Sequence, residues 1–199
     1  MAYDFRLAEE EKQELLRIAR ATLKEYLISG RVPPGAPHRK CLLAAAGAFV
    51  SLHAGDRLRG CIGTLAESQP LYKAIQEMAV AAASRDPRFE PVTSEELALL
   101  KIEVSVFGER YQILGPAEVE VGKHGLCISA AGRRGLLLPQ VATEHGWGPE
   151  AFLERTCEKA GLPRDAWRLP DAFIEVFTAQ VFAEKAAAPK VTPPATAAG

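Results

Sequence analysis

Residues 47–65 read GAFVSLHAGDRLRGCIGTL, and this stretch predicts the element on which the rest of the fold is built. Two apolar runs with strand-forming residues flank Gly55 and Asp56, a pair typical of tight turns. Two strands joined by such a turn form a β-hairpin. The second run contains Gly60 and Gly63, and glycine inside a strand often marks a bulge or the close approach of a ligand or another backbone. We therefore predict a hairpin whose second strand contributes to a functional site.

Periodic apolar residues outside the hairpin predict the remaining elements. Helices are expected over residues 8–28, 70–84 and 149–160, with a short one over residues 94–99. Strands are expected over residues 47–53, 58–65, 102–106, 119–121, 126–130, 135–138 and 173–182. Because the strands do not alternate regularly with helices, we predict an α+β fold with a mostly antiparallel sheet and flanking helices.

The composition is that of one globular domain. The chain has 199 residues, of which 48% are hydrophobic and 25% are charged, which suffices for a real core. We expect the domain to cover residues 1–184, and residues 185–199, rich in Ala and Pro, to form a disordered tail. The net charge of −1 disfavours a general nucleic-acid-binding protein, because neutralising phosphates requires basic residues.

The cysteines and the first residues indicate a location. The four cysteines form no C-x-x-C pair, so neither a zinc framework nor a disulfide scaffold is expected. The acidic N-terminal residues do not resemble a signal peptide, and no apolar stretch is long enough to span a bilayer. We therefore expect a cytoplasmic protein with no bound metal and no membrane association, and the sequence indicates no particular cofactor.

Cys61 is the first candidate for a chemical role. It lies between two glycines and near Arg59, and a cationic neighbour favours the reactive thiolate. The functional interpretation is a reactive thiol with Gly60 and Gly63 leaving room for a ligand. The alternative is a small buried hydrophobe in a strand, which is the more frequent role of a free cysteine.

Two further segments carry candidate polar groups. Arg85 and Arg88 lie around Asp86 directly after the second predicted helix, and the two arginines would clamp an anionic ligand or would pair with Asp86 to fix the loop. His124 is expected in a turn between strands, where it would be a base near neutral pH or a solvated turn residue. His53 and His145 are weaker candidates.

Several segments in this order resemble the AMMECR-one family, also called AmmeMemoRadiSam system protein A. They are LRGCIGTL at 58–65, DPRF at 86–89, EVSV at 103–106, GKHGL at 122–126, LLPQV at 137–141, GW at 146–147 and KAGL at 159–162. The resemblance covers roughly Leu7 to Glu184, and the hexad LRGCIG is specific to that family.

The resemblance implies an α+β fold with a larger and a smaller lobe, and places the hexad near a cleft between them. It also implies a pathway shared with a Memo-like protein and a radical-SAM enzyme. It makes one shared site more plausible than unrelated structural details. The residues of that site would be Cys61 and His124 as catalytic groups, with Arg59, Gly60, Gly63, Asp86, Arg88 and Gln140 as ligand-binding groups.

Three interpretations of function follow. The first is an enzyme or enzyme component, with Cys61 as nucleophile, His124 as base and arginines holding an anionic group. The second is a non-catalytic module that binds the Memo-like protein or the radical-SAM enzyme. The third is an RNA-binding or RNA-modifying factor, which the net charge disfavours. We favour the first.

Overall fold

The fold is one antiparallel sheet with helices on it, as the computed structural model shows for residues 6–35 and 37–185. Six strands lie in the order β2-β1-β3-β6-β4-β5. The predicted α+β class with an antiparallel sheet is therefore confirmed. From residue 186 onwards, the predicted disordered tail lies outside the described residues. The strands are β1 (Ala48–Ala54), β2 (Arg57–Thr64), β3 (Leu100–Ile113), β4 (His124–Ala130), β5 (Arg133–Leu137) and β6 (Phe173–Ala183).

The predicted hairpin is formed by β1 and β2. Gly55 makes the turn with a φ of +61°, which favours glycine because it has no Cβ to collide with the backbone. The pairing register shifts by one residue between Leu52 and His53, so β2 carries an extra residue at this point. This bulge, together with the position of β2 at the sheet edge, places the hexad where loops from elsewhere in the chain reach it.

One face of the hairpin is covered by helices and the other is not. The helices α1 (Glu9–Ser29) and α2 (Leu71–Ser84) pack against it, and Ala48, Val50 and Leu52 of β1 are fully buried beneath them. Side chains alternate between faces along a strand, so Ser51 and His53 point to the opposite face. The polar residues of β1 are therefore collected on the face without these helices.

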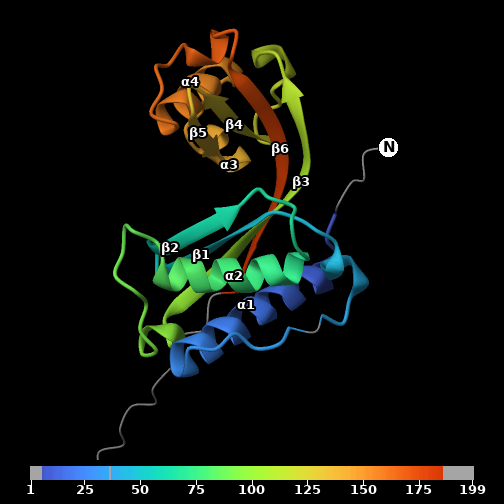
Figure 1. Ribbon diagram of the computed structural model, residues 1–199, viewed down its shortest axis with the longest axis vertical. Coiled ribbons are helices and arrows are strands. Elements are labelled where there is room, and N and C mark those ends of the chain that lie inside the picture. The colour runs from blue at the N-terminus through green and yellow to red at the C-terminus, as the bar shows by residue number, and fades with distance from the viewer. Residues whose placement is uncertain (1–5, 36, 186–199) are drawn as a thin grey trace, which may run out of the picture.

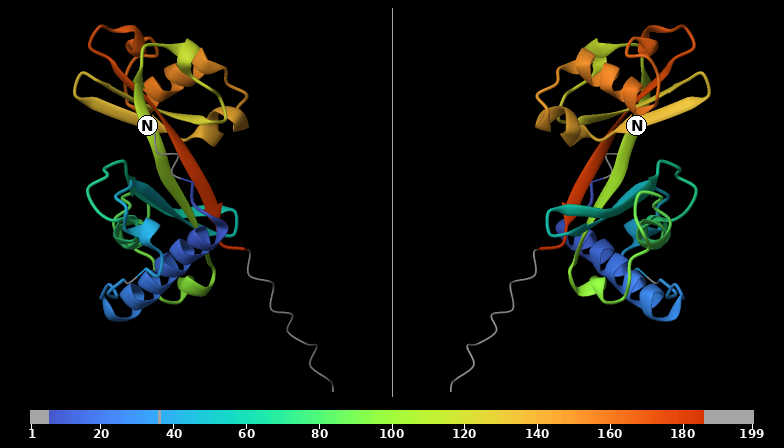
Figure 2. Two further views of the ribbon diagram at one scale, coloured as in Figure 1. Left: turned by 90° about the vertical axis from the view of Figure 1, so that its right-hand side faces the viewer. Right: turned by 90° about the vertical axis from the view of Figure 1, so that its left-hand side faces the viewer.

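The long strands β3 and β6 run side by side through both halves of the molecule (Figures 1 and 2), and each half has its own hydrophobic core. They pair along most of their length, with an irregularity between Phe107 and Arg110. The first core lies under α1 and α2. The second lies under α4 (Pro149–Lys159), where Phe152 and Leu153 are fully buried. The predicted division into a larger and a smaller lobe stays a prediction, but the two cores give it a physical basis.

Several local predictions differ from the structure. The strand expected over residues 102–106 is longer and spans Leu100–Ile113, and the short helix expected over residues 94–99 is a 3-10 helix over Glu96–Ala98. Residues 119–121 are not a strand, because they follow a short 3-10 helix (Pro116–Glu118) and lead into a turn in which Lys123 and His124 donate to the carbonyl of Glu120. The helix α3 (Pro139–Glu144) was not predicted, because six residues are too few to show a helical period. No helix in the described part of the chain is long and apolar enough to cross a membrane.

Candidate functional site

Cys61 lies in a row of polar side chains across three strands. Cys61 of β2 is opposite Ser51 of β1, and Ser51 is opposite Glu103 of β3. Directly opposite residues in antiparallel strands share a face, so this thiol, hydroxyl and carboxylate lie side by side on the face that α1 and α2 leave uncovered. The Ser51 hydroxyl donates a hydrogen bond to the Cys61 sulfur over 3.1 Å. Cys61 is partly exposed.

Asp86 and Arg88 hold the outer edge of β2 at Cys61. The backbone amide of Cys61 donates to Oδ2 of Asp86 over 2.8 Å, and a guanidinium nitrogen of Arg88 donates to the Cys61 carbonyl over 3.3 Å. These two side chains therefore satisfy the two backbone groups that a neighbouring strand would satisfy. They also pair with each other, with 2.7 Å between the guanidinium and the carboxylate. We call Asp86 and Arg88 the edge clip.

The electrostatics of the edge clip are strongly coupled. Asp86 is buried, and its hydrogen bonds from Arg88 hold the pKa of its carboxyl well below the ordinary value of 3.8, against the opposing effect of burial. The same pairing raises the pKa of the Arg88 guanidinium. Asp86 is therefore ionised at neutral pH and fully engaged within the chain. The sequence left two roles open here, the binding of an anion and the mutual pairing of Asp86 and Arg88. The structure contains the mutual pairing, which fixes the loop.

Arg59 is also engaged within the chain. Its guanidinium makes a two-pronged contact with the carboxylate of Glu96, at 2.7 and 3.1 Å. It further donates to the backbone carbonyls of Glu90 and Pro91. The carboxylate of Glu96 in turn accepts from the backbone amide of Thr93, which is one half of a capping box. Arg59 thus fastens the loop after α2 to the edge strand.

The two glycines of the hexad are sites of close packing. A Cβ at position 60 would lie 2.1 Å from the carbonyl oxygen of Ala82 in α2. A Cβ at position 63 would lie 2.1 Å from ring atoms of Phe49. Gly60 therefore lets α2 approach β2, and Gly63 makes room for an aromatic ring. The close approach that the sequence predicted exists, and its partners are parts of this chain.

His124 lies apart from Cys61. It is the first residue of β4 and is buried, rather than solvated in a turn. Its Nδ1 accepts from the backbone amide of Glu120 over 3.1 Å, and its Nε2 lies 3.3 Å from the hydroxyl of Tyr111. Burial lowers the pKa of its imidazole below 6.5. The structure therefore does not bring His124 and Cys61 together as a base and its thiol.

Gln140 lines a cavity over the uncovered face of the sheet. The volume of this cavity is about 640 Å³, and its walls come from the sheet on one side and α3 on the other. We call it the α3 cavity. The lining residues are His53, Glu103, Gly122, Pro139, Gln140, Thr143, Glu144, Ala179 and Val181.

The α3 cavity contains residues that the sequence reasoning ranked low or missed. Glu103 belongs to both the cavity and the row with Ser51 and Cys61. His53 was a weak candidate because it ends a strand, yet its Nε2 atom is buried and has no hydrogen-bond partner among the residues that the structure describes. Strand alternation is the signal that points to His53, because Ser51 and His53 are two residues apart on β1 and share a face. Glu103 joins them because it is opposite Ser51.

The comparisons with known proteins decide the family. A model of the AMMECR1 family matches residues 16–182. The chain belongs to the AMMECR1 family. Curated relatives include a protein of Methanopyrus kandleri, 42% identical over 189 residues, covering 90% of this chain and 91% of the relative. Another, from Thermococcus gammatolerans, is 42% identical over 194 residues and covers 91% and 94% of the two chains.

The fold of this AMMECR1 protein is shared by a solved structure. The crystal structure of an uncharacterised protein from Pyrococcus horikoshii aligns with a TM-score of 0.85 and 38% sequence identity. The alignment covers 91% of this chain and 95% of that chain. These relatives identify the family and the fold, and they assign no activity.

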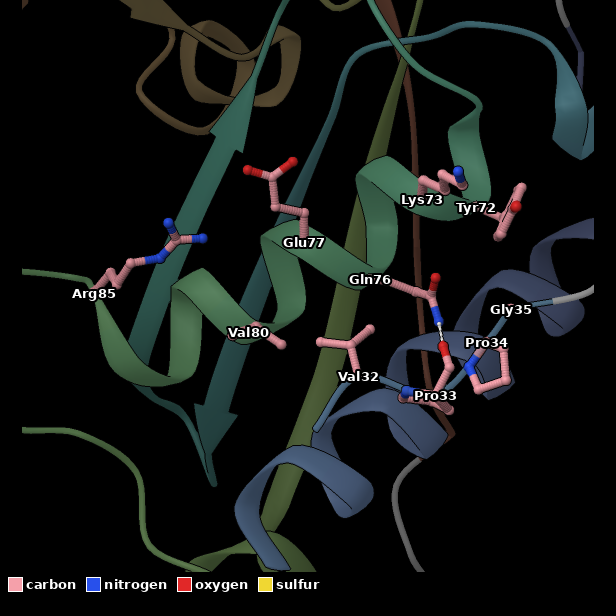
Figure 3. A pocket seen from close by; sticks show the side chains of 10 residues that line it. All are labelled: Val32, Pro33, Pro34, Gly35, Tyr72, Lys73, Gln76, Glu77, Val80 and Arg85. Atoms are coloured by element: carbon pink, nitrogen blue, oxygen red, sulfur yellow. Dashed lines mark hydrogen bonds between the residues drawn. The ribbon is translucent and has the colours of Figure 1, made fainter. Parts of the chain in front are cut away.

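A second concave surface of this AMMECR1 protein lies away from Cys61. It is a groove of about 580 Å³ between α2 and the segment that follows α1. Figure 3 shows Pro33 and Tyr72 on its two sides, with the amide of Gln76 donating to the carbonyl of Pro33 over 3.0 Å. None of the predicted site residues lines it. The lining residues are Val32, Pro33, Pro34, Gly35, Tyr72, Lys73, Gln76, Glu77, Val80 and Arg85.

Proposed function

We propose that this chain is an enzyme, or a component of one, whose reactive group is the Cys61 thiol. The observation that carries the proposal is the placement of the thiol on the uncovered face of the sheet, where Ser51 donates a hydrogen bond to it. A hydroxyl that donates to sulfur stabilises the negative charge of a thiolate, which is the nucleophilic form.

Two more features support a reactive role for Cys61. Its backbone is held by the edge clip, so the thiol is presented from a rigid strand, as a precise site requires. The second feature is the guanidinium of Arg88, which donates to the carbonyl of this residue and is itself paired with the carboxylate of Asp86. The guanidinium of Arg59, the cation that the sequence predicted beside the thiol, is paired with Glu96.

The proposed cellular setting is the one that the family resemblance implies. We propose a cytoplasmic role for this AMMECR1 protein in a pathway shared with a Memo-like protein and a radical-SAM enzyme. In this setting the chain would bind a small molecule on the uncovered face and use Cys61 on it. Direct proton transfer from Cys61 to His124 forms no part of the proposal, since each group is hydrogen-bonded elsewhere.

The proposal is tested by alkylation of the native protein with iodoacetamide, followed residue by residue with peptide mass spectrometry. We expect Cys61 to react at pH 7 faster than the thiol of a short unstructured peptide. Ser51→Ala should slow the reaction, because the donor to sulfur is lost. Ser129→Ala, on β4 in the other half of the sheet, is the control and should leave the rate unchanged. Reaction slower than the peptide would make Cys61 a packing residue and overturn the proposal.

The groove beside Tyr72 favours the alternative of a partner-binding module. Val32 lies in it and is 49% exposed, and Pro33 and Pro34 stiffen its rim. The occupant would be the Memo-like protein or the radical-SAM enzyme. Val32→Asp should then abolish complex formation in size-exclusion chromatography, whereas Cys61→Ser should preserve it. Val121→Asp, at a position 39% exposed outside the groove, is the matched control.

No contact of the described residues favours the RNA alternative. The arginines that the RNA alternative would use on phosphates are Arg57, Arg59, Arg85 and Arg88. Arg57 and Arg85 are exposed, and Arg59 and Arg88 are paired with the carboxylates of Glu96 and Asp86. The net charge of −1 points the same way.

A further inference from the structure

We propose that the α3 cavity binds a small aliphatic amine in its cationic form. This inference deepens the proposed function, on which it rests, by naming the class of molecule that would lie next to Cys61. It is carried by the cavity itself, by the charge of its walls and by a buried polar atom without a partner.

The cavity is large enough for a small-molecule ligand and is built from rigid elements. Its volume of about 640 Å³ falls within the range usual for ligand pockets. The floor comes from β1, β3 and β6, with the small side chain of Ala179 in it. The other wall is α3, which presents Gln140, Thr143 and Glu144. Polar groups on opposite walls would therefore contact the same ligand.

The charge of the walls selects a cation. Glu103 comes from the sheet and Glu144 from α3. Neither carboxylate has a hydrogen bond or an ion pair within the described part of the chain, and no lysine or arginine lines the cavity. Lys101 is opposite His53 on the sheet but lines a different cavity. An ammonium group would gain charge-assisted hydrogen bonds here, and an anion would be repelled.

The neighbouring cavity has the opposite character. It shares Gly122 and Ala179 with the α3 cavity, but Arg6, Lys12 and Lys123 line it together with Glu109. Negative charge is therefore concentrated on the α3 side of this surface. This contrast makes the sign of the ligand charge the property to test.

His53 supplies the second, independent observation. Its Nε2 atom is buried and has no partner in the described residues, whereas buried polar atoms in proteins are nearly always hydrogen-bonded. In the tautomer that carries its proton on Nδ1, this Nε2 atom is an acceptor, and the ammonium group of the ligand would donate to it. The Gln140 amide, the one predicted ligand-binding residue in this cavity, would contact the same molecule.

The position of Glu103 connects the amine to the thiol. Glu103 and Cys61 are separated by one strand, with Ser51 between them. Two strand spacings amount to about 10 Å. A ligand whose ammonium group is held by Glu103 would therefore extend along the face and bring its other end near the sulfur of Cys61.

The proposal is tested by NMR titration of the full chain with three four-carbon probes: butylamine, butan-1-ol and butyrate. These molecules share a hydrocarbon chain and differ in charge. We expect butylamine to shift the amide resonances of His53, Glu103 and Gln140, and to bind at least tenfold more tightly than the other two. Glu103→Gln should weaken butylamine binding by about tenfold, because a charge-assisted hydrogen bond is lost.

Two further variants make the outcomes decisive. Glu67→Gln removes the same charge from an exposed position outside the cavity and should leave binding unchanged. Equal binding of the three probes, equal effects of Glu67→Gln and Glu103→Gln, or no butylamine binding at millimolar concentration would overturn the proposal. Cys61→Ser should keep amine binding. Failure of the thiol proposal would thus appear in the alkylation rates, and failure of the amine proposal in these titrations.

Discussion

The carboxylate of Asp86 accepts a hydrogen bond from the backbone amide of Cys61 over 2.8 Å, although 25 residues separate the two along the chain. The same carboxylate is paired with Arg88, whose guanidinium reaches the Cys61 carbonyl. An unpaired edge strand is a liability because its backbone groups are open to pairing with other chains. The edge clip closes this edge at the residue that carries the thiol.

Asp86→Ala should destabilise the protein strongly. The change leaves the Cys61 amide without its acceptor and Arg88 without its counter-ion, at a position that is buried. We expect a loss of about 2–4 kcal/mol in the free energy of unfolding, measured with guanidinium chloride. Asp171→Ala, at an exposed position, is the control and should change it by less than about 0.5 kcal/mol. An equal effect of the two changes would show that the edge clip contributes little.

The contribution of Asp86 should disappear in acid. The pKa of its carboxyl is lowered by Arg88 from the ordinary value of 3.8, so the unfolded chain binds the proton more readily than the folded one. The stabilisation is therefore complete above the unfolded value and is lost as the pH falls towards the folded value. The difference in unfolding free energy between the wild type and Asp86→Asn should be constant from pH 7 to 5 and shrink below pH 4. A difference that grows in acid would contradict this assignment.

Gly60→Ala should weaken the packing of α2 on the sheet. The new Cβ would lie 2.1 Å from the carbonyl oxygen of Ala82, which is backbone within a helix and has little freedom to move. We expect a destabilisation of about 1–3 kcal/mol, seen as a lower midpoint of chemical unfolding. Gly115→Ala is the matched control, because it has an extended backbone and no atom within 4 Å of the added carbon. An unchanged midpoint for Gly60→Ala would contradict the tight packing of α2 against β2 at this position.

His124 should make stability depend on pH near neutrality. Burial lowers the pKa of its imidazole from 6.5, so the unfolded state binds more protons below that value. The free energy of unfolding should therefore fall as the pH falls through 6.5. Glu120 opposes this shift and Lys123 adds to it. In His124→Gln the slope between pH 7 and 5.5 should be flatter than in the wild type, and an unchanged slope would exclude His124 as its source.

Cys41 should be alkylated far more slowly than Cys61 at pH 7. Both are partly exposed, whereas Cys127 and Cys157 are buried. Burial, together with the hydrogen bond to the Glu11 carboxylate, raises the pKa of the Cys41 thiol to about 11. Its alkylation rate should still be rising at pH 10, as measured by peptide mass spectrometry. In Glu11→Gln the rise should move to lower pH, because the carboxylate that disfavours the thiolate is gone. A rate for Cys41 that levels off by pH 9 would contradict this.

Local patterns were sufficient for most of the fold. The two runs around Gly55 gave the hairpin, and the apolar stripes gave α1, α2 and α4 nearly to their ends. These elements are long enough to show a period, and their turns use glycine where the backbone requires it. Residues 119–121 and 139–144 were misread because segments of three and six residues carry too little periodic signal.

The arrangement of the candidate site could not be predicted from local sequence patterns. The hexad was identified as important, yet Arg59 proved to be paired with Glu96, 37 residues away, and Gly60 to face the backbone of α2. Sequence gives the type and order of such groups. Their partners depend on which face of a strand each side chain occupies and on which loop returns to the sheet edge.

By itself, therefore, the sequence determined the family, the α+β class and the hairpin, because each is encoded in short-range spacing and residue type. Only the tertiary structure decided that Cys61, Ser51 and Glu103 form one row, that His124 is buried apart from them, and that His53 and Gln140 face one cavity. The physical reason is strand register. A shift of the register by one residue would turn every side chain of a strand to the opposite face. The burial of Ala48, Val50 and Leu52 under the helices fixes the register.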